Sequence, residues 1–473
     1  MTGSPSATPG RSAPESPLER ALDRACGGRA IPGNRLRHLA DGPSAFALMV
    51  QAIDEARRFV HLENYLIRDD ATGRRFAERL GAAARRGVAV RVLYDAFGCR
   101  ATPRAFWRRL RQVGVEARAF NPVNPFRPVR SLRRDHRKYV GVDGARAVVG
   151  GLCIGDEWAG DPGRRRLPWR DTAVDVCGPA AAAIDVTFHR LWRLAGGEIP
   201  NRDAQGETEP CGSASVRAVE GLPGRLRIYR AFELLVAGAA HRVWITEAYL
   251  VAPTPLVAGL IAAARDGVDV RLLLPGKSDI PALRAFTRVG YRELLQAGAR
   301  IWEWRGPMLH AKTVLADQGW LKVGSSNLNP SSLLANYELD VLANDPDLAE
   351  EAAHQFRRDL THATEVMLRR PRVPARLAGR WPPAVVSAGV PHTVADHTPG
   401  ARERSRRAVI ALRVVAAGAR RSIAGAFLFG SVGLGVLFAL APQIMGYLVA
   451  LVCFTVAVNA GRQFLVRRRQ RDE

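Results

Sequence analysis

Hydrophobic and polar positions follow the same order twice along this chain. The β-branched and aromatic run at residues 59–66 predicts a strand, and a stretch with helical spacing follows it and ends at Gly87. An alternating run at residues 88–93 then predicts a second strand. The same order returns further along, where a strand, the end of a helix and another strand are expected at residues 243–250, Gly267 and residues 268–273.

The two stretches also share residues, which indicates a tandem duplication. Both contain Glu-x-Tyr-Leu, then Ala-Ala-Ala-Arg-x-Gly-Val-x-Val-Arg, then Gln-x-Gly, and corresponding positions stay about 174 to 184 residues apart. A strand–helix–strand unit favours an α/β fold with right-handed crossovers and a sheet covered by helices on both faces. We expect copy one at residues 30–201, a polar linker at 202–215 and copy two at 216–370.

Each copy carries one HxKxxxxD motif at a corresponding place. Because side chains alternate along a strand, His and Lys of each motif should share one face. The aspartate has the opposite parity, so it should serve the turn or orient a neighbour. Surface residues of an edge strand could explain one such motif, but two motifs in register inside a duplication argue against that. The motif residues are His136, Lys138, Asp143, His310, Lys312 and Asp317.

These motifs are accompanied by a wider pattern, which resembles the phospholipase D superfamily and, within it, the bacterial cardiolipin synthases. The pattern covers about residues 35–345 and implies tandem phospholipase D-type domains, each a mixed β-sheet flanked by helices. The supporting segments are Gly324-Ser325-Ser326-Asn327, Asn336-Tyr337-Glu338, Gly150-Gly151-Leu152-Cys153-Ile154-Gly155-Asp156-Glu157-Trp158 and Trp169-Arg170-Asp171-Thr172.

The resemblance implies roles for the motif residues and for four others. It makes all six motif residues a catalytic set, with His136 as nucleophile and His310 as acid and base. It gives substrate-phosphate binding or support to a second set, Ser325, Asn327, Glu338 and Asp171. One position departs from the family pattern, since Cys153 stands where Asn is usual. A thiol is a weaker hydrogen-bond partner than an amide, so either the support of motif one is weaker or copy two carries the phosphate contacts.

The chemistry of these residue types suits phosphodiester cleavage with no cofactor and no metal. Lysine ammonium groups can hold the nonbridging oxygens of the phosphate and stabilise a pentacoordinate transition state. One imidazole can attack phosphorus while the other protonates the departing alcohol and later deprotonates the incoming one. No His/Asp/Glu cluster with metal-ligand spacing accompanies the motifs. His61 has no partner motif and is expected to be a structural or surface histidine.

Composition adds an anionic partner and a reducing compartment. The formal net charge is +24, which fits nucleic acid, acidic lipid headgroups or a phosphorylated substrate. Only four of the basic residues are lysines, so each lysine should have a specific role. The six cysteines form no CxxC pair and are expected to be reduced thiols in the cytosol.

The two ends of the chain differ in composition from the copies. Residues 1–29 are expected to be a disordered tail, and residues 371–401 a Pro- and Gly-rich linker. A basic amphipathic segment at 402–421 and a basic tail at 462–473 flank two charge-free apolar runs, which Pro442 separates. These runs predict a transmembrane hairpin at 422–461. Because arginines lie outside the hairpin, the positive-inside rule places both ends and the catalytic copies in the cytoplasm, at a bacterial inner membrane.

Four functions are compatible with this sequence. The resemblance favours phosphatidyl transfer from one phosphatidylglycerol to a second glycerol-bearing lipid, which yields cardiolipin. Hydrolysis to phosphatidic acid would use the same site with water as acceptor. A nuclease or phosphodiesterase fits the basic charge, but membrane anchoring argues against it, and we expect no specific nucleic acid. A non-catalytic scaffold is disfavoured because both motifs are intact.

Overall fold

The computed structural model describes residues 16–124, 126, 128–161, 163–200, 208–280 and 287–368. The fold below is that of the compact unit to which these residues belong, residues 124–129 excepted. Within the described residues no helix is both long and apolar enough to cross a membrane. The expected linker, basic segment, hairpin and basic tail at residues 371–473 all lie outside the described ranges.

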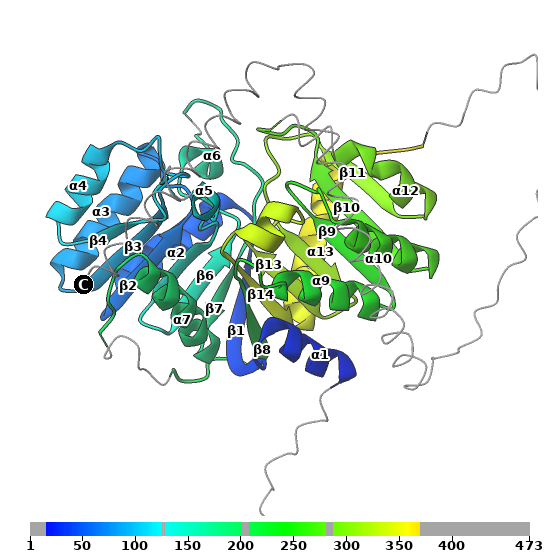
Figure 1. The fold of residues 1–473 in the computed structure, drawn as a ribbon, viewed down its shortest axis with the longest axis horizontal. Helices are drawn as coiled ribbons and strands as arrows, with labels where there is room; N and C mark the ends of the chain where they lie inside the picture. Colours follow the sequence, from blue (N-terminus) through cyan, green and yellow to red (C-terminus); the bar gives the residue numbers. More distant parts are fainter. Residues whose placement is uncertain are drawn as a thin grey trace, which may run out of the picture. The chain divides into compact units, whose positions relative to one another are not determined.

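Copy one alternates strands and helices from β1 onwards (Figure 1). Its strands are β1 (Ile31–Leu39), β2 (Phe59–Asn64), β3 (Ala89–Asp95), β4 (Glu116–Phe120), β5 (Lys138–Val142), β6 (Arg146–Gly150) and β7 (Ala173–Cys177). Its helices are α2 (Gly42–Glu55), α3 (Ala71–Arg85), α4 (Arg104–Gln112), α5 (Pro128–Ser131), α6 (Asp156–Ala159) and α7 (Pro179–Leu194).

Copy two repeats this order. Its strands are β8 (Ala214–Gly221), β9 (Arg242–Thr246), β10 (Asp269–Pro275), β11 (Arg300–Trp304), β12 (Thr313–Ala316), β13 (Trp320–Gly324), β14 (Glu338–Asn344) and β15 (Ala363–Glu365). Its helical segments are α9 (Arg227–Gly238), α10 (Thr254–Arg265), α12 (Tyr291–Gln296), the π-helical turn η1 (Ser331–Ala335) and α13 (Pro346–Thr361).

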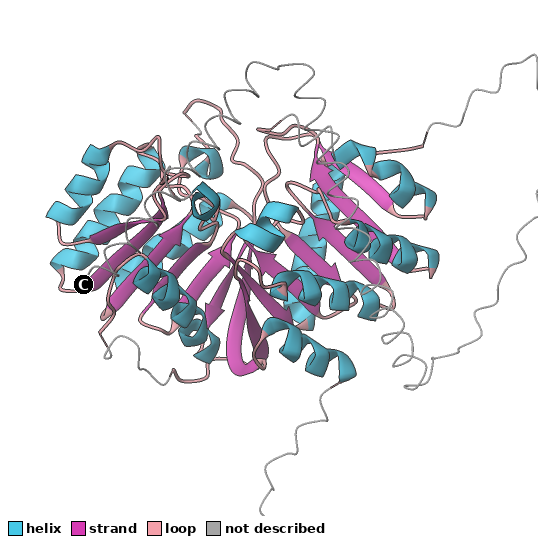
Figure 2. Ribbon diagram, in the orientation of Figure 1, coloured by secondary structure: helices cyan, strands magenta, loops and turns pink. Residues whose placement is uncertain are grey.

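The strand order is the same on both sides of a central pair, β8 and β1. It reads β15-β11-β10-β9-β12-β13-β14-β8-β1-β7-β6-β5-β2-β3-β4. In copy one β2, β3 and β4 are parallel, whereas β5 is antiparallel to β2. Copy two has the same arrangement for β9, β10, β11 and β12. The expected mixed sheet in each copy is therefore confirmed, and helices flank the strands on both faces (Figure 2).

Hydrophobic side chains form three cores. One lies within copy one and includes Phe46, Phe76 and Trp107. Another lies within copy two and includes Phe232 and Leu272. The third joins residues of both copies, such as those of α7 and α13, and this shared core fixes the two copies against each other.

The strand–helix–strand units follow from local signals in the sequence. In copy one, the Asp70 carboxylate caps α3 by accepting the Gly73 backbone N–H at 2.9 Å. The helix then ends before Gly87, whose φ of 87° lies in the left-handed region that glycine tolerates best. Gly267, at the matching place in copy two, has φ 88°. The predicted strands and helices around these glycines are confirmed.

Part of the expected disordered tail is instead a helix. The prediction for residues 1–29 is wrong at α1 (Pro17–Cys26), which packs against α9. Ser16 and Glu19 form a reciprocal capping box at its start, and Leu22 is fully buried. The polar, Pro-rich composition around the segment concealed a short amphipathic helix whose partner lies more than 200 residues away in the sequence.

Candidate active site

Both motif histidines lie where a strand begins at the same kind of sheet edge. Lys138 starts β5 opposite Asn64, the last residue of β2. In copy two, Thr313 starts β12 opposite Thr246, the last residue of β9. The loops that follow the parallel strands leave the sheet at this edge, which we call the catalytic edge.

The backbone of each histidine is bound by the opposite copy. The His136 N–H donates to the Tyr337 carbonyl oxygen at 2.9 Å, and the His310 N–H donates to the Arg170 carbonyl oxygen at 2.7 Å. Tyr337 and Arg170 each precede a carboxylate residue, Glu338 and Asp171. The two motifs are thus brought together by contacts that cross between the copies.

Each imidazole is also paired with a buried carboxylate of the opposite copy. His136 Nδ1 lies 3.0 Å from both carboxylate oxygens of Glu338, and His310 Nδ1 lies 2.7 Å from Asp171 Oδ2. Both carboxylates are inaccessible to solvent. Because an ionised carboxylate can only accept, Nδ1 of each ring carries the proton and Nε2 keeps its lone pair. The nitrogen available for chemistry is therefore Nε2 in both cases.

The charges around the two rings set their protonation. Burial opposes ionisation of Glu338 and Asp171, but the paired His136 and His310 hold the pKa of each carboxyl below its usual value. Burial lowers the pKa of His136. Burial, with the Lys312 ammonium beside it, lowers the pKa of His310 to about 4. Both rings are therefore neutral near pH 7 before a phosphate enters.

The two motif lysines are buried beside the rings. Each ammonium donates to the backbone oxygen of the histidine of its own motif. Lys138 Nζ lies 5.2 Å from the ring centroid of Tyr65, and Lys312 Nζ lies 5.9 Å from that of Tyr249. Burial lowers the pKa of Lys312 to about 8.

The tyrosines are site residues that the sequence reasoning did not identify. Tyr65 meets His136 edge-on at 5.1 Å between ring centroids, and Tyr249 meets His310 at 5.9 Å. The signal was present in the sequence, because both belong to the repeated Glu-x-Tyr-Leu. In the sequence alone, this repeat indicates the duplication but does not distinguish a site residue from a structural one.

Two further predicted residues, Ser325 and Asn327, differ in their contacts with this cluster. The Ser325 hydroxyl donates to Glu338 Oε2 at 2.5 Å and so helps to fix the partner of His136. Asn327 is 4% exposed, and its Oδ1 has no hydrogen-bond partner within the described ranges. Its assignment to the substrate phosphate stays a prediction.

His310 lies beside two tryptophans in addition to its tyrosine. Trp158 Nε1 donates to Asp171 Oδ2 at 2.8 Å, and its ring meets that of His310 edge-on at 5.4 Å. Trp169 lies 5.9 Å from the same imidazole. A Cβ at Gly151 would lie 2.1 Å from Asp171 Oδ1, so only glycine leaves room for this carboxylate.

Cys153 is buried near both motif lysines. Burial raises the pKa of its thiol even though the Lys138 and Lys312 charges act in the opposite direction, so the side chain is a neutral thiol. The corresponding position of copy two is Asn327. The two halves of the site therefore differ at this position.

Asp143 and Asp317 are not brought to the histidines. The Asp143 carboxylate accepts the backbone N–H groups of residues 57, 58 and 59 at 2.8 to 2.9 Å, where β2 begins. Asp317 accepts the N–H groups of residues 240, 241 and 242 at the start of β9. Both have positive φ, 57° and 49°. They lie at the sheet edge opposite the catalytic edge, and their contacts are those of turn residues. The expectation that they belong to the catalytic set is therefore corrected: these two aspartates support the turns and do not contact the histidines.

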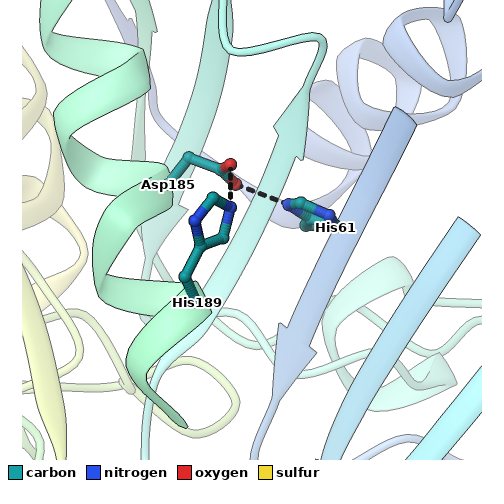
Figure 3. Close-up of side chains that lie close together, drawn as sticks. All are labelled: His61, Asp185 and His189. Atoms are coloured by element: carbon teal, nitrogen blue, oxygen red, sulfur yellow. Dashed lines mark hydrogen bonds and ion pairs between the residues drawn. The ribbon is translucent and has the colours of Figure 1, made fainter. Parts of the chain in front are cut away.

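A separate buried group, His61, Asp185 and His189, lies close enough together to suggest a metal site (Figure 3). His61 Nδ1 is 2.8 Å from Asp185 Oδ1, and His189 Nε2 is 2.8 Å from Asp185 Oδ2. However, Arg91 Nη1 lies 3.1 Å from His61 Nε2. Since arginine only donates, Nε2 must accept and Nδ1 must carry the proton that it gives to Asp185. His61 is thus a structural residue that joins β2 to α7, as expected.

The site therefore has two imidazoles whose Nε2 atoms keep their lone pairs. A carboxylate of the other copy holds each ring, and buried ammonium groups flank both. This arrangement defines a phosphodiester-processing enzyme of the phospholipase D type. Comparison with known proteins identifies the group more narrowly. The family described as "Cardiolipin synthase, PLD-like domain" matches residues 49–156 and 235–360. This chain belongs to that family and is an enzyme of the phospholipase D superfamily.

Individual relatives agree with this assignment. The chain is 33% identical over 351 residues to cardiolipin synthase A of Pseudomonas aeruginosa strain LESB58, which covers 73% of this chain and 71% of the relative. It is 32% identical over 362 residues to cardiolipin synthase A of Pseudomonas syringae pv. syringae strain B728a, which covers 76% and 75%. The fold is similar to the crystal structure of a phosphatidylserine synthase from Haemophilus influenzae Rd KW20, with a TM-score of 0.58, 16% identity and coverage of 74% and 92%.

Proposed function

We propose that this chain transfers a phosphatidyl group from phosphatidylglycerol to a second glycerol-bearing lipid and so makes cardiolipin. The observation that carries the proposal is the pair of crossed contacts, His136 with Glu338 and His310 with Asp171, which creates one two-histidine site from two copies. The names of the relatives support phosphatidyl transfer as the reaction. Phosphatidylglycerol and cardiolipin are therefore the proposed lipid partners.

In the first step, His136 Nε2 attacks phosphorus and the bond to the departing glycerol oxygen breaks. The glycerol leaves with a proton from His310 Nε2, so that a phosphatidyl-histidine and a neutral alcohol result. The His136 Nδ1–H remains on the ring and keeps donating to Glu338, whose negative charge offsets the positive charge that the phosphorylated ring gains. Lys138 and Lys312 are the proposed ligands of the nonbridging oxygens.

Substrate binding must precede protonation of His310. In the substrate-free site the pKa of His310 is about 4, because of burial and the Lys312 charge. A phosphodiester carries a negative charge, and when it enters between the lysines it makes the imidazolium form more favourable. His310 can then act as acid in the first step. In the second step it takes the proton of the incoming alcohol, whose oxygen displaces His136 from phosphorus.

We propose the membrane as the location, with the catalytic copies on the cytoplasmic side of a bacterial inner membrane. The support comes from the sequence, in which two charge-free runs within 422–461 stand between basic segments at 402–421 and 462–473. The same composition supports anchoring by this hairpin. Fractionation of cells expressing the full chain, with and without residues 422–473, tests the anchor.

The test of function uses purified full-length protein in micelles with acyl-labelled phosphatidylglycerol. We expect cardiolipin from the wild type and almost none from His136→Ala or His310→Ala, because both imidazoles act on one phosphorus. His354→Ala is the matched control, since this side chain is 62% exposed and its ion pair, among the described residues, is with the surface residue Glu350. If either site variant made product at the wild-type rate, the single-site proposal would fail.

The products also separate the alternatives. Phosphatidic acid formed without cardiolipin would identify a hydrolase that uses water as acceptor. Cleavage of single-stranded DNA, with no lipid product, would identify a nuclease. No turnover of either substrate would leave only a non-catalytic role.

A further inference from the structure

Exposed apolar side chains gather on the loops of the catalytic edge. These loops follow β3, β4, β6, β10 and β13, the strands whose carboxyl ends lie at that edge. Large apolar side chains that are between 43% and 79% exposed occur on each of them. They are Phe97, Leu132, Leu167, Ile280, Val289 and Leu334.

The same loops carry exposed basic residues between the apolar ones. Two acidic residues there are already engaged, since Asp279 Oδ1 accepts the Tyr249 hydroxyl at 2.7 Å and Asp161 Oδ1 accepts the Arg164 N–H at 3.1 Å. Positive charge and apolar surface therefore occur together around the opening of the site. The exposed basic residues include Arg100, Arg133, Arg164, Arg165, Arg166 and Lys277.

The loop after β6 is held in a defined turn by hydrogen bonds, and it leads directly to a residue that contacts His310. Asp161 and Arg166 exchange two backbone hydrogen bonds of 2.8 Å, and Arg165 at the turn between them has φ 53°. Leu167, 68% exposed, follows at once. Two residues further, Trp169 packs beside His310.

We propose that these loops form a membrane-docking rim, by which the catalytic edge sits on the surface of an anionic phospholipid bilayer. The inference rests on the proposed function, because a diacyl substrate keeps its chains in the bilayer while its phosphate reaches the lysines. Side chains that enter the acyl boundary beside cations that meet headgroup phosphates are typical of interfacial binding. A nucleic acid would match the arginines but would set its phosphates against the apolar side chains.

The rim adds a contact that is independent of the C-terminal segments. The hairpin would hold the protein at the membrane, whereas the rim would orient the site so that its opening faces lipid. Leu167 comes from copy one and Leu334 from copy two, and neither contacts a motif residue in a hydrogen bond or ring pair. These two positions allow both halves of the rim to be tested without altering the catalytic groups.

The direct test is photo-crosslinking of the full chain in proteoliposomes of phosphatidylglycerol and a zwitterionic lipid. A photoreactive p-benzoyl-phenylalanine replaces Leu167 or Leu334, and, as matched controls, Val186 or Leu194. The controls are 50% and 54% exposed on α7, which packs along the sheets (Figure 1). We expect phospholipid adducts at the two rim positions, about tenfold above the controls. Equal yields, no adducts, or adducts only to protein at positions 167 and 334 would overturn the proposal.

The kinetic test separates the rim from the reaction. Leu167→Asp combined with Leu334→Asp should lower turnover of phosphatidylglycerol in vesicles by about tenfold. The same variant should turn over a dissolved short-chain phosphatidylglycerol within about twofold of the wild-type rate. The control variant, Val186→Asp combined with Leu194→Asp, should stay within about twofold of the wild type for both substrates. Unchanged turnover in vesicles would refute the rim. If the wild type turned over neither lipid, the proposed function would fail, and the crosslinking would still decide the inference.

Discussion

Replacement of Glu338 by glutamine tests whether the crossed carboxylate supports catalysis or only the fold. In the wild type, Glu338 lies 3.0 Å from His136 Nδ1. Glutamine has nearly the same shape and can still accept this hydrogen bond, but it carries no charge. When Nε2 binds phosphorus, the ring keeps its Nδ1 proton and becomes cationic. Opposite charges about 4 Å apart attract by about 4 kcal/mol at an effective dielectric constant near 20. Loss of that attraction in the transition state corresponds to a roughly 10³-fold fall in turnover.

The assay is cardiolipin formation by the full chain across a range of pH, together with thermal unfolding. Glu338 favours the imidazolium form, so its removal should lower the pKa of His136 further. The nucleophile must be neutral, and activity therefore rises with pH through that pKa; the acidic limb of kcat/KM should move to lower pH in the variant.

The control for this substitution is Glu350→Gln, which alters a carboxylate–histidine pair on the surface, 3.4 Å from His354. We expect no change in turnover from it. A Glu338→Gln enzyme that is folded and retains more than about a tenth of wild-type turnover would refute the electrostatic reasoning. A large loss with an unmoved acidic limb would indicate that the carboxylate acts by shape alone.

Three other substitutions probe the site and its support. Asp143→Asn should lower the free energy of unfolding, measured by urea titration, by about 2–4 kcal/mol, because it weakens three hydrogen bonds to backbone N–H groups. A loss of turnover like that expected for Glu338→Gln would instead show that this carboxylate takes part in the reaction. Since Lys312 has a pKa of about 8, it is protonated below that pH and neutral above it, so kcat/KM of the wild type should fall above about pH 8; this alkaline limb should vanish in Lys312→Arg, and its persistence would exclude Lys312 as its source. Gly151→Ala should displace Asp171 and reduce turnover at least about tenfold, and a wild-type rate would show that the carboxylate can move without cost.

The local elements of the fold could be predicted because each is encoded over a few neighbouring residues. The β-branched run before α3 and the glycine after it mark a strand and a helix end in both copies. Helix α1 was missed because its stability comes from Leu22 packing against α9, a contact that its own short sequence does not reveal.

The site was predictable to the extent that repetition marks it. Spacing identified His136 and His310, and the resemblance identified Glu338 and Asp171. Neither could say which carboxylate holds which histidine, since that depends on how β1 and β8 join the two copies in one continuous sheet. Parity did predict that Asp143 faces away from the motif histidine, and its three backbone contacts show why a carboxylate is needed there.

The rarity of lysine in the sequence predicted some of the site residues but not all of their roles. Lys138 and Lys312 lie in the motifs, and Lys277 is exposed on a loop of the catalytic edge. Lys322 has a different reason, because its buried ammonium is 2.8 Å from Asp340 Oδ2 in copy two. Rarity therefore indicated that each lysine has a role, but only the fold distinguishes a phosphate ligand from a structural ion pair.

The exchange of carboxylates between the copies has a genetic consequence. Each working histidine is encoded partly in the first half of the gene and partly in the second, because His136 depends on Glu338 and His310 on Asp171. A missense change at Glu338 or Asp171 is therefore expected to impair a histidine whose own codon is intact. Neither half can be lost without breaking both pairs, so the halves are inherited as one functional unit despite their common origin.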